Sequence, residues 1–257
     1  MRSLLKFAKA RSRPLGQAEA SAIELHQARF SVGCYGRRTG GDCHDFFRIG
    51  PTKVGFALLD VAGRRDQNAG IISAAQTAFR SLAADLLDRD GVNEADAMIE
   101  ICLRLNAAIL KTAGRPCSCP AFAGCFNESL GTVCYFNAGH TPGLLGDQAG
   151  VTELPATGLP LGLFSHGTPD APTIALPPGA AMLVVSRGMV EARRKRQEFG
   201  FHHVKESFRQ AMSGSSDRIC TTMIEELQGF MGGRPPRNDV TVLALARDAK
   251  AAAAFAR

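Results

Sequence analysis

Residues 53–63 read KVGFALLDVAG, an apolar run that ends in an acid and a glycine. The content of Val, Phe and Leu predicts a buried β-strand over 53–61. Asp60 lies near the end of this run, where an unpaired buried carboxylate would be costly. We therefore expect Asp60 either to cap a turn or helix, or to be hydrogen-bonded, ion-paired or bound to a metal ion.

The chain on both sides of this stretch alternates between groups of strands and pairs of helices. Strands are predicted ahead of it at 28–35 and 44–49. Two helices follow it, because apolar residues recur there at spacings of three and four, and then strands at 119–126 and 130–136. The rest of the chain predicts strands over 172–176, 181–185 and 240–246 and helices over 200–212 and 217–231. Such segregated groups favour an α+β layered domain over a βαβ repeat.

Composition limits the class of protein. A chain of 257 residues forms one large domain or two small ones, and 45% hydrophobic residues suffice for a sizeable core. A net charge of +6 is weak evidence for nucleic acid, and we expect no such partner. The eight cysteines include no CxxC pair, and the chain shows neither a secretory signal nor a membrane-length apolar segment. We therefore expect a cytoplasmic protein with reduced thiols.

The domain organisation follows from the charge and strand patterns. We expect a basic leader over 1–27 that is partly helical or disordered, one domain over 28–247, and a tail over 248–257. The leader could mediate a homodimer contact. A second basic run, Arg193–Arg196, is interpreted as solvated surface, which is the usual fate of such runs.

Two further aspartates stand beside predicted strands. Asp42 follows Gly40 and Gly41, and Asp239 opens the run VTVLALA. A GGD triplet by itself is more typical of a turn. Together with Asp60, however, the three carboxylates could converge from several strand ends, which is how proteins hold Mg²⁺ or Mn²⁺ for phosphate-ester hydrolysis. Neither a Ser/His/Asp elbow, nor a Cys-x5-Arg loop, nor a glycine-rich nucleotide loop with Lys occurs.

Six motifs extend this interpretation to most of the chain. In order they are GGDCHDFF (40–47), LLDVAG (58–63), YFNAGHTPGLL (135–145), LPLGLF (159–164), LVVSRGMVEAR (183–193) and NDVTVLAL (238–245). This series resembles the bacterial PPM-type metal-dependent serine/threonine phosphatases, in the branch of the sporulation stage II protein E and the sigma-factor regulators. The resemblance implies an αββα four-layer sandwich with Mn²⁺ or Mg²⁺ at one end of the strands.

The resemblance also implies roles for single residues. It implies that Asp42, Asp60 and Asp239 are metal ligands and catalytic residues, and that the backbone carbonyl of Val61 is a further ligand. His140 lies in the NAGH turn of the family. We interpret it as a structural residue, because a histidine in a tight turn usually caps backbone groups.

Two departures from the family pattern bear on activity. Arg187, in Ser-Arg-Gly, stands where the family has Thr/Ser-Asp-Gly, so it replaces a metal ligand. The turn at Gly63 continues with Arg64 and Arg65, where the family has a second glycine. Arg187 stays protonated at working pH. Pointing inward, it would pair with the aspartates and leave the metal at reduced occupancy or absent; pointing outward, it would bind substrate phosphate. We favour the inward course.

Two functions therefore remain open. The first is a phosphatase that dephosphorylates Ser or Thr on a regulatory protein, such as an anti-sigma-factor antagonist, by metal-activated water, with catalysis weakened or lost because of Arg187. The second is a pseudophosphatase that binds a partner without hydrolysis. The residue at position 187 discriminates between them, because an Asp there would favour the enzyme.

Overall fold

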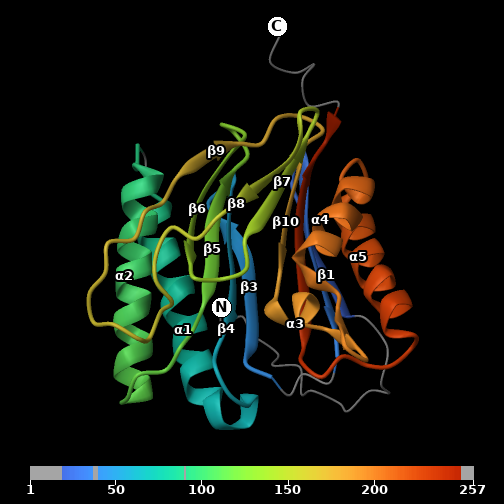
Figure 1. Cartoon of the computed structure of the whole chain (residues 1–257). Helices are drawn as coiled ribbons and strands as arrows, with labels where there is room; N and C mark the ends of the chain where they lie inside the picture. Colours follow the sequence, from blue (N-terminus) through green and yellow to red (C-terminus); the bar gives the residue numbers. More distant parts are fainter. Residues whose placement is uncertain (1–18, 37–39, 90, 250–257) are drawn as a thin grey trace, which may run out of the picture.

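The computed structural model describes residues 19–36, 40–89 and 91–249. Two antiparallel sheets face each other, and a pair of long helices covers the outer face of each sheet (Figure 1). The α+β class and the αββα four-layer sandwich predicted from the sequence are confirmed. Most predicted strands and helices are present with shifts of one or a few residues.

The first sheet has six strands and carries the C-terminal helices. Its central strand, VTVLALAR, is almost entirely buried because it has a sheet neighbour on each side and is covered on both faces. Helices α4 (Gly200–Ala211) and α5 (Ser216–Met231) pack on its outer face. The strands lie in the order β1 (Glu19–Glu24), β2 (Ala28–Tyr35), β13 (Val240–Arg247), β10 (Ala181–Val185), β7 (Gly143–Asp147) and β8 (Gly150–Leu154).

The second sheet has five strands and carries the N-terminal helices. Helices α1 (Arg65–Leu87) and α2 (Glu94–Ala113) cover its outer face. Its strands lie in the order β3 (Asp42–Ile49), β4 (Lys53–Asp60), β5 (Ala121–Asn127), β6 (Thr132–Ala138) and β9 (Thr173–Ala175). Beyond the two sheets, a short helix α3 (Arg187–Val190) precedes a two-stranded ribbon of β11 (Arg193–Arg194) and β12 (Gln197–Glu198).

Three apolar layers hold the sandwich together. Between the sheets, the ring of Phe56 lies 5.3 Å from that of Phe30 and 6.5 Å from that of Phe122, measured between centroids. All three rings are fully buried, so each contributes about 2 kcal/mol or more through area removed from water. Phe79 anchors the layer under α1 and α2, and Phe208 anchors the layer under α4 and α5. The core is therefore rich in phenylalanine.

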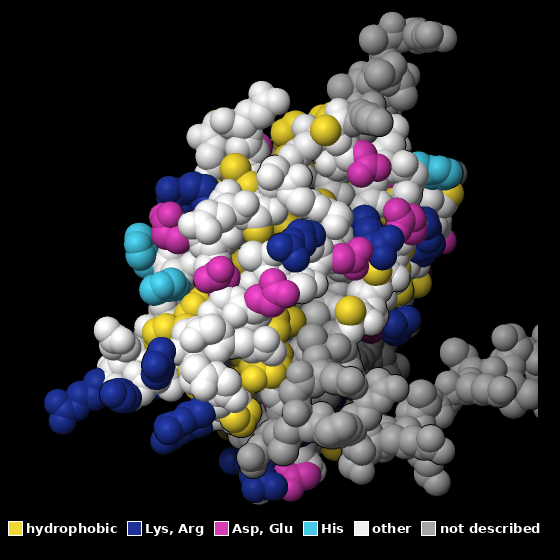
Figure 2. All heavy atoms as spheres, turned by 90° about the vertical axis from the view of Figure 1, so that its right-hand side faces the viewer, with side chains coloured by type: hydrophobic (Ala, Val, Ile, Leu, Met, Phe, Trp, Pro, Cys, Tyr) yellow, Lys and Arg dark blue, Asp and Glu magenta, His cyan; other side chains and the backbone are white. Residues whose placement is uncertain are grey.

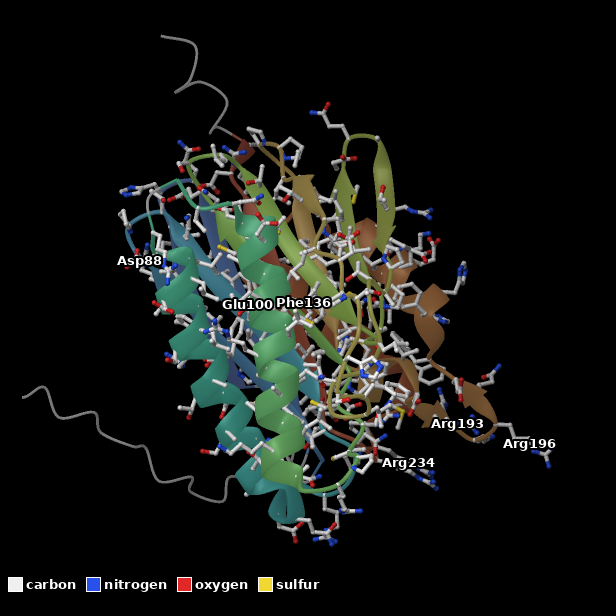
Figure 3. The ribbon with its side chains drawn as sticks, turned by 90° about the vertical axis from the view of Figure 1, so that its left-hand side faces the viewer. Asp88, Glu100, Phe136, Arg193, Arg196 and Arg234 are labelled. Carbon is white, nitrogen blue, oxygen red and sulfur yellow. The ribbon has the colours of Figure 1, made fainter. Side chains whose placement is uncertain are left out.

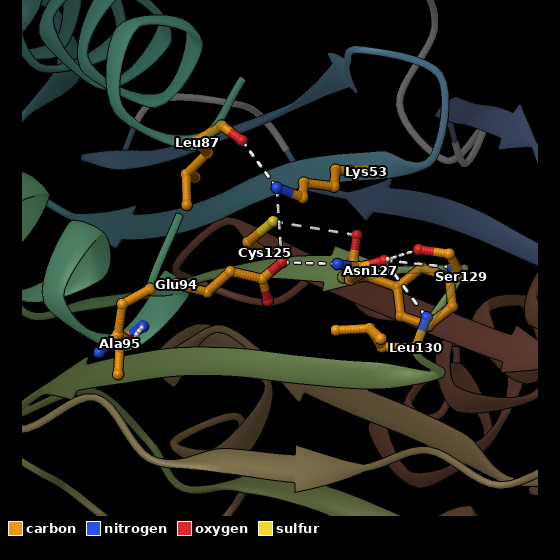
Figure 4. Close-up of polar contacts among 10 residues, drawn as sticks. Lys53, Leu87, Glu94, Ala95, Cys125, Asn127, Ser129 and Leu130 are labelled. Carbon is orange, nitrogen blue, oxygen red and sulfur yellow. Dashed lines mark hydrogen bonds and ion pairs between the residues drawn. The ribbon is translucent and has the colours of Figure 1, made fainter. Parts of the chain in front are cut away.

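A polar network fixes the helices on the second sheet at the end where β4 begins (Figure 4). Lys53 donates from Nζ to the carbonyl of Leu87 at 2.8 Å and lies 3.6 Å from the Glu94 carboxylate. Asn127 donates to the same carboxylate at 2.6 Å. The network joins the end of α1, the start of α2 and the end of β5. Asp60 lies at the opposite end of β4, so this network fixes the scaffold and not the candidate site.

Asn93 caps the start of α2, as its position before Glu94 and Asp96 predicts. Its side-chain oxygen accepts hydrogen bonds from the backbone N–H groups of Ala95 and Asp96. Replacing Asn93 by Ala should lower the free energy of unfolding by about 1 kcal/mol, because two donors lose their partner. Urea unfolding measures this difference. Gln210→Ala, which removes an exposed amide from α4, should change it by less than about 0.5 kcal/mol; equal losses would contradict the capping role.

The predicted domain boundary at residue 28 is wrong for the residues just before it. Residues 19–24 form the edge strand β1, which pairs with β2 along its whole length. The strand depends on pairing with β2 and not on its own sequence, EASAIE, in which only one residue is β-branched. The expected leader over 1–18 and the tail over 250–257 lie outside the described residues. Among the described helices, none has the length and apolar character needed to cross a bilayer.

Candidate active site

The candidate site lies at one end of the sandwich, where both sheets contribute strand ends. Asp42 opens β3 and Asp60 closes β4, and the two residues are direct partners across these antiparallel strands. In the other sheet, Asp239 immediately precedes β13, and Arg187 follows β10 by two residues. The hydroxyl of Thr241 in β13 donates to the Asp42 carboxylate at 3.4 Å, which links the two sheets here. The short helix α3 marks this end in Figure 1.

Gly41 brings the Val61 carbonyl close to the start of β3. A Cβ on Gly41 would lie 1.7 Å from the Val61 oxygen, a distance that no side chain tolerates. The Val61 N–H in turn donates to the Gly41 carbonyl at 3.2 Å. The glycine before Asp42 is therefore required for close backbone approach, and the Val61 carbonyl lies beside the aspartates.

The Asp239 carboxylate has a hydrogen-bond donor at one oxygen and none among the described residues at the other. The Gly40 N–H donates to its Oδ2 at 2.8 Å. Its Oδ1 is buried and has no hydrogen-bond partner among the described residues. Gly188 allows α3 to pack here, because a Cβ on it would lie 1.9 Å from the Asp239 carbonyl oxygen. A buried carboxylate oxygen without a donor can accept a hydrogen bond or a cation.

Ser186 is a site residue that the sequence interpretation missed. Its fully buried hydroxyl accepts from the Thr241 N–H at 3.0 Å and donates to the Asp239 carbonyl at 3.4 Å, and it also lowers the pKa of Asp42. It thereby joins the end of β10 to the start of β13 beside Asp42. Its place directly before Arg187, at the end of an apolar strand, is the one signal in the sequence that could have identified it.

Arg187 points toward Asp60. Its Nε lies 3.0 Å from Asp60 Oδ2 and 3.9 Å from the carboxylate of Glu191. The Asp60 side chain is only 10% exposed, whereas the Arg187 side chain is 54% exposed. One edge of the guanidinium therefore neutralises a buried carboxylate while much of the side chain faces solvent. Arg187 takes the inward course of the two described above and still has N–H groups to offer.

His140 lies just after β6, and Gly63 lies in the bend that follows β4. The His140 N–H donates to the Asn137 side chain at 2.8 Å, and its Nδ1 lies 3.1 Å from the Thr141 carbonyl. Burial lowers the pKa of His140 to about 4, so the ring is neutral near pH 7. Its Nε2 is buried without a partner among the described residues. Gly63 has φ +109°, which favours glycine. The structural role of both remains a prediction.

The three aspartates outnumber the positive charge that Arg187 supplies. Burial raises the pKa of Asp42 to about 7, and the neighbouring charges of Asp60 and Asp239 act in the same direction. Hydrogen bonds from Ser186 and Thr241 oppose this shift and are too weak to cancel it. Near neutral pH Asp42 is therefore divided between its protonated and ionised forms. The negative charge that Arg187 does not balance can be balanced by a further cation or by a proton.

The Asp42 carboxyl should make stability depend on pH in metal-free buffer containing EDTA. Its folded pKa of about 7 lies above the unfolded value of 3.8, so the folded state holds the proton more tightly. Its contribution is complete below about pH 4 and is lost as pH rises through about 7. We expect Asp42→Asn to gain about 4 kcal/mol relative to the natural chain between pH 4 and pH 8, because about three pKa units at about 1.36 kcal/mol each separate the two states. Urea unfolding of both proteins across this pH range measures the difference. If the free energies of unfolding of the two proteins depended on pH in the same way, the prediction would be contradicted.

The residues present fit the expected Mn²⁺ or Mg²⁺ only in part. The orphaned Asp239 oxygen favours a cation. Asp60, in contrast, already has a cationic partner in Arg187. Among the described residues, no three His, Cys, Asp or Glu side chains come together as they would around a metal ion. The donor set is therefore reduced, and we derive no reaction step through a metal ion.

Comparisons with known proteins agree with this architecture. The SiaA-PP2C domain of Pseudomonas aeruginosa superimposes with a TM-score of 0.69 at 16% identity, covering 84% of this chain and 86% of that domain. The catalytic domain of the serine/threonine phosphatase PstP, solved in complex with two manganese ions, gives a TM-score of 0.62 at 15% identity. That match covers 86% of this chain and 99% of the PstP domain. At such identities these structures show the fold.

Sequence comparisons show the family. Protein IcfG of Synechocystis sp. is 27% identical over 129 residues, which are 49% of this chain and only 20% of IcfG. The chain thus matches about a fifth of the length of this curated relative. The family model described as Stage II sporulation protein E matches residues 50–248. The chain therefore belongs to the stage II sporulation protein E family and has the fold of a PPM-type phosphatase domain.

Proposed function

We propose that this chain recognises a phosphorylated Ser or Thr segment of a bacterial regulatory protein and hydrolyses the phosphate slowly or not at all. Arg187 is the residue that binds the phosphate. The observation that carries the proposal is the contact of 3.0 Å between Arg187 Nε and Asp60 Oδ2. It supports a fixed cation at the place where the family pattern implies a metal-ligand Asp.

The geometry of Arg187 allows it to bind a phosphate while it remains paired with Asp60. A guanidinium has five N–H groups in a planar fork, and the contact with Asp60 uses only the one on Nε. With 54% of the side chain exposed, the remaining donors can reach a ligand from solvent. Arginine forks match two phosphate oxygens at once, which gives both strength and orientation. The inward and outward courses of Arg187 are therefore compatible in one conformation.

The same contact supports weak hydrolysis. An ion at this site would depend on Asp42, Asp239 and the Val61 carbonyl, because Asp60 is engaged. Bound Mn²⁺ or Mg²⁺ supplies an activated water and neutralises phosphate charge. The protonated form of Asp42 and the charge of Arg187 both oppose its binding. The family suggests an anti-sigma-factor antagonist as the substrate, or another small phosphoprotein of sigma-factor regulation.

Phosphopeptide binding in EDTA tests this function without metal. By fluorescence anisotropy, the natural chain should bind a phosphoserine peptide with uncharged flanks more tightly than its unphosphorylated form. Arg187→Gln should reduce that preference by about tenfold, which corresponds to the loss of one charge-assisted hydrogen bond. Arg209→Gln removes an exposed, ion-paired arginine from α4 and should leave it within about twofold. An unchanged preference in Arg187→Gln would exclude Arg187 as the phosphate ligand.

A further inference from the structure

Four basic side chains lie on segments that adjoin the candidate site along the chain and are not used by it. Lys195 and Arg196 form the tip of the β11–β12 ribbon, and Arg234 and Arg237 lie on the loop between α5 and β13. All four are exposed. We call these four residues the basic rim. The ribbon begins six residues after Arg187, and Arg237 stands two residues before Asp239, so both halves of the rim adjoin the site along the chain.

Contacts hold the two halves of the rim together. Arg194 of the ribbon donates from Nη1 to the Phe230 carbonyl at 3.3 Å, near the end of α5. Its guanidinium carbon lies 3.7 Å from the place where a Cβ on Gly232 would stand, at the start of the loop. Phe199 is buried at the base of the ribbon and packs edge-on against Phe230 at 5.4 Å. The ribbon is therefore fixed to α5 and is not a free arm.

The charges of the rim are unneutralised. Arg193 pairs with Glu198 across the ribbon, but no ion pair within 4.0 Å joins Lys195, Arg196, Arg234 or Arg237 to an acidic residue in the described part of the chain. Figure 3 labels Arg196 and Arg234 near the lower corner where the ribbon projects. Figure 2, from the opposite side, shows Lys and Arg side chains projecting at the corresponding edge. The rim is therefore an exposed positive surface.

Lys195, at the tip of the ribbon, has a backbone conformation that residues other than glycine rarely adopt. The ribbon has a two-residue loop, because Arg194 pairs with Gln197, and Lys195 has φ +56°. Such loops favour Asn-Gly, since residues other than glycine are strained at positive φ. Lys195 is the only described residue other than glycine with positive φ. Strain retained at an exposed tip beside a site motivates a functional hypothesis for the residue that carries it.

We propose that the basic rim docks an acidic segment of the substrate protein, next to the phosphorylated residue that Arg187 holds. This inference rests on the proposed function, which supplies the phosphorylated residue. Charge complementarity is its physical basis: several cations on one surface attract a polyanionic segment, raise the association rate and set its register. The rim selects among phosphoproteins by the charge of the flanking sequence and takes no part in phosphate chemistry.

Peptide binding to charge-reversed variants tests the rim. The probes are short phosphoserine peptides with acidic or uncharged flanks, and the acidic peptide without phosphate. Lys195→Glu combined with Arg196→Glu should weaken binding of the acidic phosphopeptide by about tenfold or more and that of the uncharged-flank phosphopeptide by less than about twofold. The control, Arg89→Glu combined with Arg104→Glu, makes the same charge change at exposed, ion-paired arginines of the other helix layer. It should change both by less than about twofold.

Each other outcome has a defined meaning. If acidic flanks give the natural chain no advantage, or if the rim and control variants weaken binding equally, the rim is solvated surface and the proposal is overturned. A single-stranded oligonucleotide that displaces the acidic phosphopeptide and binds more tightly would assign the rim to nucleic acid instead. If the acidic peptide binds equally with and without phosphate, yet is lost in the rim variant, the rim stands and the proposed phosphate recognition fails.

Discussion

Replacing Arg187 by Asp is expected to raise turnover of p-nitrophenyl phosphate in Mn²⁺ by about 100-fold or more. The substitution removes the cation that pairs with Asp60 at 3.0 Å and supplies the carboxylate that the family pattern has at this position. Two unit charges about 4 Å apart interact by roughly 4 kcal/mol at an effective dielectric of 20, and a divalent ion doubles the repulsion. Relief of even part of this repulsion corresponds to several powers of ten in metal affinity.

Arg209→Asp is the matched control for this gain of activity. It makes the same change of charge on α4, where Arg209 pairs with Glu206 on the exposed face. We expect it to leave turnover within about twofold of the natural chain. Equal turnover in the natural chain and in Arg187→Asp, at saturating Mn²⁺, would show that Arg187 does not limit hydrolysis.

Gly41→Ala is expected to lower the free energy of unfolding by about 3 kcal/mol. The new methyl group would stand 1.7 Å from the Val61 carbonyl oxygen, so either β3 or the turn after β4 must move. That movement also displaces Asp42 from its partner position opposite Asp60. We therefore expect the gain of activity from Arg187→Asp to disappear when Gly41→Ala is added. Urea unfolding and the turnover assay measure the two effects.

Gly70→Ala gives the contrasting result. Gly70 lies inside α1, and apart from the neighbouring backbone of its own helix no described heavy atom stands within 4 Å of where its Cβ would be. Alanine is preferred to glycine in a helix interior, so this variant should be more stable by about 0.5–1 kcal/mol. If both variants lost stability to the same extent, close approach of Gly41 to Val61 would not be the cause.

Local sequence patterns predicted the elements that pack through their own apolar content. The run VGFALLD is buried as a strand from Val54 to Asp60, and the apolar positions of α5 face the first sheet. The hairpin of β7 and β8 was not predicted, because GLLGD and GVTEL are short and begin with glycine. Their strand character depends on pairing with each other and with β10, which no local pattern contains.

The candidate site likewise contains residues that the local sequence predicted and contacts that it did not. Asp42, Asp60 and Asp239 could be singled out because each stands at the end of a predicted strand. Their partners could not, since each contact joins segments far apart in the chain. The Gly40 N–H donates to Asp239, and Arg187 forms an ion pair with Asp60 of the other sheet. The direction of Arg187 follows from how the sheets pack, so the sequence left it open.

Calorimetric titration of Mn²⁺ into the natural chain, with Arg187→Asp in parallel, tests most directly whether Arg187 has replaced the metal ion. The account predicts that the variant binds Mn²⁺ about 100-fold or more tightly than the natural chain, in which the heat of binding is weak or absent. Equally tight binding by both proteins would contradict it. Arg187 would then share the site with the metal, and the natural chain would be a fully competent phosphatase domain.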